Sequence, residues 1–132
     1  MNLLMLDTDI SSYVIRRRPP SIAERFARHA EQLCVSVMTA AELRFGAAKA
    51  GRPELASLIE AYLARLTILE WGDSVTFHYA RIRTELERLG TPIGNMDLLI
   101  ACHAVAEQAT LVTNNVKHFS AVPGLKIEQW TA

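Results

Sequence analysis

The chain has 132 residues and a formal net charge of zero, and half of its residues are hydrophobic. This length predicts a single domain over residues 1–132 with an independent core, and the hydrophobic share excludes intrinsic disorder. The balanced charge excludes a bulk attraction to nucleic acid, so RNA binding would have to come from local basic patches.

The sequence gives no sign of disulfide pairing, secretion or membrane insertion. Cys34 and Cys102 fall inside apolar segments and are predicted to be reduced core residues. The first apolar run lacks a preceding basic region and stops at Asp7, unlike a signal peptide. No stretch approaches the roughly 18 apolar residues of a membrane helix. We therefore expect a cytoplasmic protein.

Apolar runs and helical periodicity alternate along the first half of the chain. Residues 3–6 predict a buried strand, and a helix over about 10–17 follows, with Thr8 or Asp9 as its N-cap. After a break at two prolines, the pattern predicts a helix over 22–29, a strand over 33–37, and helices over 40–50 and 53–66. Ser36 or Thr39 is the expected cap of the helix over 40–50.

The second half repeats this alternation. The expected elements are a strand over 67–71, an amphipathic helix from Asp73 or Ser74 to Gly90, a loop over 91–96, a helix over 97–108, a strand over 109–113 and a possible strand over 125–128. Strands separated by helices imply parallel crossover connections. The fold class is therefore predicted to be α/β, with a mostly parallel sheet covered on both faces.

Three acidic residues stand where apolar runs end or helices open. Asp7 follows the first predicted strand, Glu42 lies early in the helix after the second, and Asp97 opens an apolar helix. Such acids are costly to bury unless they are paired or bound to a cation. Mg²⁺ prefers oxygen ligands. We predict that the three acids form one Mg²⁺ or Mn²⁺ site, where an activated water hydrolyses phosphodiester bonds.

Other interpretations of the same residues stay open. Each acid can be a helix N-terminal residue favoured by the helix dipole, in a non-catalytic RNA- or protein-binding module. Asp7-Thr8-Asp9 after a strand also fits an aspartyl-phosphate-type phosphatase, in which the first Asp attacks phosphorus. That class needs a catalytic Lys and a late acidic pair, and no such pair follows the later strands. Under the metal-site interpretation, Asp9 is instead a helix N-cap.

Four segments carry a resemblance to a known family: residues 5–8, 36–46, 93–101 and 112–115. In this order and spacing they resemble the PIN-domain ribonuclease toxins of bacterial type II toxin–antitoxin modules, the VapC type, and the similarity runs on to Trp130. The resemblance implies a three-layer α/β/α fold with a central, mostly parallel sheet and an Mg²⁺- or Mn²⁺-dependent endoribonuclease. It also implies a homodimer and a small VapB-type antitoxin as partner. Some members of that family cut transfer RNA, but no feature of this sequence indicates transfer RNA as the substrate.

The resemblance also assigns roles to individual residues. Asp7, Glu42 and Asp97 match the family's three acids, and Asn115 matches a fourth position that is Asp in many members and Asn in others. These four form the expected catalytic set, with Asp7 and Asp97 as direct metal ligands and Glu42 as a ligand through water or a proton acceptor. Only three of them carry a carboxylate, which argues against a strong second metal. Hydroxyl groups expected to orient the acids belong to Thr8, Ser36, Thr39 and Thr113.

Basic residues are candidates for holding RNA phosphates. The densest cluster, Arg16 to Arg18, is either a solvated run at a helix C-terminus or a phosphate-binding patch. Residues that could join it in one positive rim are Arg44, Lys49, Lys117 and His118. His103, within an apolar helix, is predicted to be a satisfied core histidine.

Overall fold

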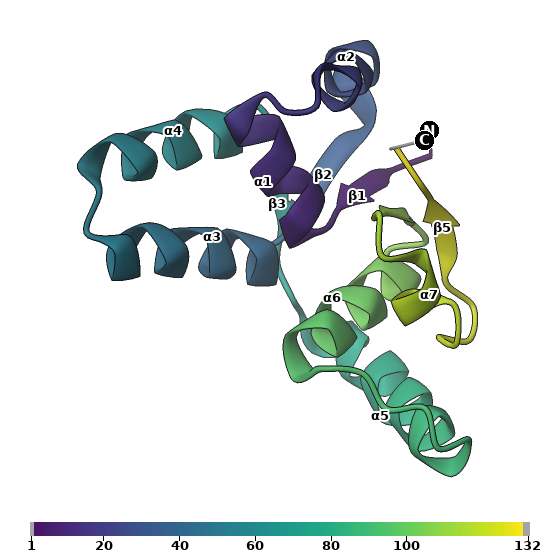
Figure 1. Ribbon diagram of the computed structural model, residues 1–132. Coiled ribbons are helices and arrows are strands. Elements are labelled where there is room, and N and C mark those ends of the chain that lie inside the picture. The colour runs from purple at the N-terminus through teal and green to yellow at the C-terminus, as the bar shows by residue number, and fades with distance from the viewer. Residues whose placement is uncertain (1, 131–132) are drawn as a thin grey trace.

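A five-stranded sheet forms the centre of the protein, and the computed structural model describes residues 2–130. All neighbouring strands are parallel, in the order β3-β2-β1-β4-β5 (Figure 1). The strands are β1 (Leu4–Leu6), β2 (Leu33–Ser36), β3 (Thr67–Leu69), β4 (Thr110–Val112) and β5 (Lys126–Glu128). The first connection from β1 leads to β2 on one side, and β4 pairs with β1 on the other. This reversal of direction opens a crevice at the carboxyl end of β1.

Helices connect the strands and cover both faces of the sheet (Figure 1). They are α1 (Thr8–Arg16), α2 (Pro20–Arg28), the short 3₁₀ helix η1 (Ala30–Gln32), α3 (Val37–Ala50), α4 (Pro53–Leu63), α5 (Asp73–Arg88), α6 (Asn95–Ala106) and α7 (Val116–Phe119). Prolines open α2 and α4, where the missing amide hydrogen is not needed. Gly51, at φ +64°, ends α3 in a left-handed conformation that glycine adopts without strain.

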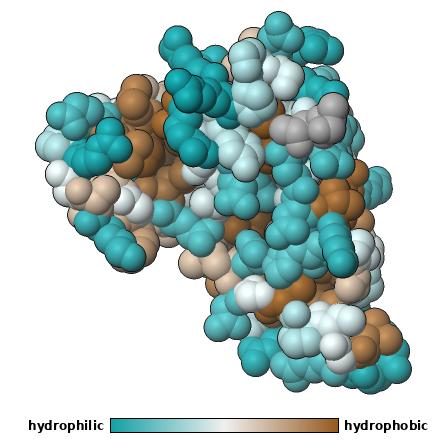
Figure 2. All heavy atoms as spheres, in the orientation of Figure 1, coloured by the Kyte–Doolittle hydropathy of each residue, from teal (hydrophilic) through white to brown (hydrophobic). Residues whose placement is uncertain are grey.

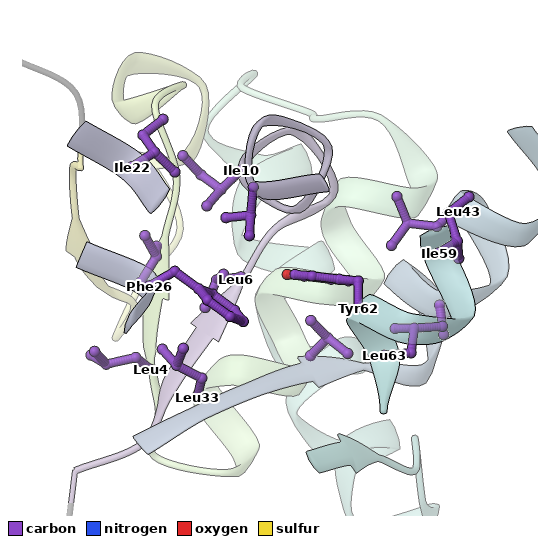
Figure 3. Close-up of a cluster of buried hydrophobic side chains, with 14 of the residues drawn as sticks. Leu4, Leu6, Ile10, Ile22, Phe26, Leu33, Leu43, Ile59, Tyr62 and Leu63 are labelled. Atoms are coloured by element: carbon purple, nitrogen blue, oxygen red, sulfur yellow. The ribbon is translucent and has the colours of Figure 1, made fainter. Parts of the chain in front are cut away.

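The sheet separates two apolar clusters. Leu4 and Leu6 of β1 belong to the cluster formed with helices α1 to α4, whereas Met5 belongs to the cluster formed with α5 and α6. Because both faces of the sheet are covered, every residue of the central strand is apolar, which explains the unbroken run seen in the sequence. Figure 3 shows the first cluster, where the rings of Phe26 and Tyr62 lie 5.6 Å apart.

The predicted fold class is confirmed, with changes at the ends of several elements. β3 and α4 end earlier than predicted, at Leu69 and Leu63. α6 begins at Asn95, inside the predicted loop, so Asp97 lies within its first turn rather than at its start. α7 was not predicted, because four residues carry too little periodicity to signal a helix.

Two predictions about the environment of the chain can be compared with the structure. Cys34 and Cys102 are both free and buried in the apolar core, as predicted. None of the helices in the described part of the chain combines the length and the apolar character that crossing a bilayer requires.

Replacing Tyr62 with Phe is expected to lower the free energy of unfolding by about 1 kcal/mol. The buried Tyr62 hydroxyl donates a hydrogen bond to Ser11 Oγ (2.8 Å) and so ties α4 to α1. The matched control is Tyr79→Phe, because the Tyr79 hydroxyl meets only the exposed Arg83 on the surface of α5 among the described contacts. Urea unfolding measures both variants, and equal losses would contradict a structural role for the Tyr62–Ser11 bond.

Candidate active site

A polar cavity of about 230 Å³ lies at the carboxyl end of β1. Its lining comes from the start of α1, from α3, from α6 and from the segment that follows β4: Asp7, Thr8, Asp9, Glu42, Asp97, Asn115 and Phe119. The starts of α1 and α3, together with α6 and α7, lie around the end of β1 (Figure 1), where the strand order reverses direction. The four residues predicted as the catalytic set therefore line one cavity, although they are distant in sequence.

Asp7 ends the central strand and caps the next helix. Its Oδ1 accepts a hydrogen bond from the Ile10 amide (2.8 Å), and its side chain is only 4% exposed. The prediction that Thr8 or Asp9 caps α1 is wrong, because the helix starts directly at Thr8 and only Asp7 has the extended backbone of an N-cap. Thr8 and Asp9 are consequently left to line the cavity.

The pKa of Asp7 is raised from 3.8 to about 6. Burial is the main cause, since desolvation disfavours the charged carboxylate. Hydrogen bonds from the Thr113 hydroxyl and the Ile10 amide oppose the shift, while the nearby charges of Asp9 and Asp97 add to it. Asp7 therefore lies in a negative, poorly solvated environment, which a bound cation would stabilise.

Glu42 is held by a contact that crosses between two helices. The Thr8 hydroxyl, at the start of α1, donates a hydrogen bond to Glu42 Oε1 (2.5 Å). Glu42 lies in the second turn of α3, whose N-terminus is capped by Ser36, as predicted: Ser36 Oγ accepts the Met38 amide (3.1 Å). The predicted contact of a hydroxyl with an acid is thus present at Thr8.

The other predicted hydroxyls divide into two groups. Thr113 contacts the site directly, because it hydrogen-bonds Asp7 and its Oγ1 accepts the amide of Asn115 (3.0 Å). Ser36 and Thr39 are fully buried near the start of α3 and are not among the residues that line the cavity.

Asp97 has a basic neighbour that the sequence analysis had assigned to a different role. His118 Nε2 of α7 lies 3.0 Å from Asp97 Oδ2. Asp97 itself lies in the first turn of α6, where the helix dipole favours an acidic group. His118, predicted as part of a positive rim, is therefore placed against an acid of the cavity.

The side chains that line the cavity offer oxygen ligands for a divalent ion. Carboxylate oxygens and the Asn115 amide share one cavity, and these are ligand types that Mg²⁺ and Mn²⁺ accept. Within residues 2–130, however, no three His, Cys, Asp or Glu side chains converge closely enough to hold one ion together. Mg²⁺ commonly binds through only one or two carboxylates and keeps several waters. The residues fit such a water-rich ion, and a three-acid ligand set stays a prediction.

Most of the predicted basic rim lies away from this cavity. Arg16 to Arg18 are exposed at the far end of α1, roughly 12 Å along the helix from Thr8. Arg44 is paired with Glu60 of α4 (2.9 Å), beside a larger hollow of about 440 Å³. This hollow lies between α3 and α4, on the side where Figure 2 shows apolar surface. Within residues 2–130, a continuous positive rim is thus not seen around the acids.

Comparison with known proteins places the chain in a family. The PIN domain family matches residues 4–125. Ribonuclease VapC2 of Rickettsia felis is 43% identical over 131 residues, which cover 97% of this chain and 98% of that protein. The chain belongs to the PIN-domain family and is of the VapC type. The tRNA(fMet)-specific endonuclease VapC of Salmonella typhimurium is 39% identical, with 96% of each chain covered.

Solved structures agree with this PIN-domain assignment over the full length. VapBC2 from Rickettsia felis, bound to a DNA fragment, matches with a TM-score of 0.92 at 42% identity, covering 98% of this chain and 99% of that one. DNA-bound VapBC from Salmonella typhimurium matches with a TM-score of 0.94 at 38% identity, covering 99% and 100%. The resemblance seen in the four sequence segments is confirmed.

One acid of this PIN-domain cavity, Asp9, was not predicted from the sequence. Asp9 had been interpreted as a helix cap, but its side chain lines the cavity and its charge raises the pKa of Asp7. The cavity therefore contains a fourth carboxylate, although Asn115 stands where many family members have Asp. A usable signal was present, because Asp7 and Asp9 flank the first residue of α1.

Replacing Asp7 with Asn is expected to raise the free energy of unfolding near neutral pH, without metal, by roughly 1–3 kcal/mol. The pKa of Asp7 is about 6 in the folded protein and 3.8 in the reference state, so the folded protein binds this proton more tightly than the unfolded chain. Ionised Asp7 therefore reduces stability progressively as pH rises from about 4 to about 6, and the full cost persists above that range. Asparagine removes the charge, and its Oδ1 can still accept the Ile10 amide.

Urea unfolding in chelator at several pH values measures this effect. The matched control is Asp9→Asn, which removes an exposed acid of the same cavity and should change stability by less than about 0.5 kcal/mol. An Asp7→Asn variant less stable than the parent protein near neutral pH would contradict the assigned cost of burying this charge.

Proposed function

We propose that this VapC-type PIN domain is a metal-dependent endoribonuclease that hydrolyses RNA phosphodiester bonds at the Asp7 cavity and acts as the toxin of a toxin–antitoxin pair. The observation that carries the proposal is the buried Asp7 with a raised pKa, which shares one cavity with Glu42, Asp97 and Asn115. Relatives named ribonuclease at 43% and 45% identity over nearly the whole chain support the reaction class.

The proposed cofactor is Mg²⁺, with Mn²⁺ as a substitute, held by Asp7 and Asp97 directly and by Glu42 directly or through water. When bound there, the ion would neutralise phosphoryl oxygens and lower the pKa of a water nucleophile. The raised pKa of Asp7 supports this role, because a cation compensates the buried charge that the fold otherwise carries at a cost.

The chain's own residues have separable tasks in this proposal. The Ile10 amide and the Thr113 hydroxyl hold the Asp7 carboxylate at the cavity wall. Thr8 holds Glu42, the candidate proton acceptor, through a hydrogen bond of 2.5 Å. Asn115 adds an uncharged amide that can accept or donate a hydrogen bond at the edge of the acids.

For substrate and partner, the proposal goes beyond the reaction class. We propose a structured RNA as substrate, with transfer RNA as the first candidate, because relatives at 38% and 39% identity are named tRNA(fMet)-specific endonuclease. A VapB-type antitoxin is the proposed partner, supported by the VapBC structures that match this fold. Action in the cytoplasm follows from an RNA substrate, and the homodimer implied by the resemblance stays a prediction.

Purified protein is expected to cleave RNA with Mg²⁺ or Mn²⁺ and to lose activity in chelator. The Asp7→Ala variant should lose at least about 100-fold in cleavage rate, because it removes a proposed ligand of the ion that stabilises the transition state. A gel assay on total RNA and on transfer RNA measures both effects. Glu60→Gln is the control, since Glu60 pairs with Arg44 at the exposed surface and is not part of the cavity lining.

Three outcomes distinguish the competing functions. Full activity of folded, metal-replete Asp7→Ala would defeat the assignment of the site. RNA binding without cleavage, and without stabilisation by Mn²⁺, would favour a binding module. Hydrolysis of a small phosphomonoester such as p-nitrophenyl phosphate, with RNA left intact, would favour the aspartyl-phosphate-type phosphatase.

Reversing the charges of Arg16, Arg17 and Arg18 to Glu is expected to weaken RNA binding at least tenfold at low salt and to flatten its salt dependence. The reason is that exposed cations near the end of α1 can contact phosphates of an RNA that extends beyond the cavity. Filter binding across salt concentrations measures the effect, and the triple reversal of the exposed Arg81, Arg83 and Arg88 on α5 to Glu controls for the same change in net charge. If RNA affinity were unchanged at every salt concentration, Arg16 to Arg18 would be only a solvated run at the end of α1 without a role in RNA binding.

A further inference from the structure

A buried polar pair joins α6 to the end of β2. His103 of α6 and Ser36 at the end of β2 are both fully buried, and His103 Nδ1 lies 2.7 Å from Ser36 Oγ in a hydrogen bond. Neither residue lines the cavity. A polar side chain buried among apolar neighbours is unfavourable unless it is hydrogen-bonded. Ser36 Oγ satisfies His103 Nδ1, while Nε2 makes no hydrogen bond of standard geometry within residues 2–130, so the bond to Nδ1 requires a specific arrangement of β2 and α6.

Ser36 connects this pair to the start of α3. Its Oγ also accepts the Met38 amide (3.1 Å), so the same oxygen caps the helix that carries Glu42. A change at Ser36 therefore affects the first turn of α3, just before the turn in which Glu42 meets Thr8. The orientation of Glu42 depends on where this helix begins.

His103 connects the pair to α6, which carries Asp97 in its first turn. His103 lies roughly 9 Å further along the same helix. Trp71, which follows β3, donates a second hydrogen bond to the Leu99 carbonyl of α6 (2.9 Å). α6 is thus held by one bond to the β2–α3 junction and one to the segment after β3, and it also packs against α3.

We propose that His103 is a positioning residue: through its hydrogen bond to the Ser36 cap, it holds α6 against the start of α3 and thereby sets the separation of Asp97 and Glu42. The inference rests on the proposed function, because the two acids matter as a pair only if they serve one ion. Two buried polar groups occupy positions within the largely apolar core, which is consistent with a need for one fixed register between α6 and the start of α3.

The test is Mn²⁺ binding to the full-length chain, measured by calorimetry with the metal alone. His103→Asn keeps a polar atom near the position of Nδ1, whereas His103→Gln moves it towards the position of Nε2. We expect His103→Gln and Ser36→Ala to weaken Mn²⁺ binding about tenfold, and His103→Asn to stay within about threefold of the parent protein. Because Ser36→Ala already removes the Ser36–His103 bond, together with the cap on the Met38 amide, adding His103→Gln should weaken binding no further.

The matched control is Cys102→Ala, which truncates a fully buried neighbour on the same helix. It should lower the melting temperature and leave Mn²⁺ affinity unchanged. If the pair had only a structural role, His103→Gln would also lower the melting temperature without changing Mn²⁺ affinity, and that result would overturn the proposal. Additive losses of Mn²⁺ affinity in the double variant would overturn it as well. Should His103→Gln fail to fold, His103→Phe, which fills similar space without a hydrogen-bonding atom, takes its place: weakened Mn²⁺ binding would support the positioning role, and parent-level binding would overturn it.

The failure of this inference can be told from the failure of the proposed function. If the parent protein did not bind Mn²⁺, the proposed metal site would be refuted, and the positioning role of His103 would be refuted with it. Parent-level Mn²⁺ binding by folded His103→Gln would remove only the positioning role.

Discussion

The burial of one carboxylate at the end of the central strand is the constraint on which the rest of the site depends. Asp7 follows β1, caps α1 and faces the cavity, so the strand, the helix and the acidic wall share a single residue. Desolvation raises its pKa to about 6, and the acids around it add to the shift. Burying the ionised Asp7 carries a cost in folding free energy, and a cation bound in the cavity would reduce that cost.

Three of the four acids of the cavity, Asp7, Glu42 and Asp97, have separate partners. Thr8 holds Glu42, His118 lies against Asp97, and Thr113 hydrogen-bonds Asp7. Like charges repel strongly in a poorly solvated space. Separate side-chain contacts therefore hold the carboxylates apart while they line one cavity. This arrangement explains why the acids are near one another and yet do not converge on a single point among the described residues.

The positions of these residues that contact the acids follow from the order of the strands. Because β1 pairs with β2 on one side and β4 on the other, the segments after β1 and β4 meet at the same edge. α3 and α6 approach from opposite layers of the sheet, which places residues from two apolar clusters at one crevice. The buried Ser36–His103 bond connects these layers, so the site depends on contacts between the two cores as well as on its own acids.

Much of this could be predicted from local patterns. Alternating apolar runs and amphipathic helices determine an α/β protein with a parallel sheet, and the three acids could be identified because each interrupts or opens an apolar segment. The role of His118 could not be predicted, since an imidazole in a four-residue helix has no periodic signature. Asp9 did carry a local signal, its position one residue beyond the start of α1, but this signal was interpreted as a helix cap.

By itself, the sequence determined the alternation of elements, the buried strands and the candidate acids, because these depend on neighbours along the chain. Only the tertiary structure decided the strand order, the choice of Asp7 over Thr8 and Asp9 as the cap, and the pairing of His118 with Asp97. These depend on how segments distant in sequence pack together, and the free energy of that packing is not encoded in any short stretch of residues.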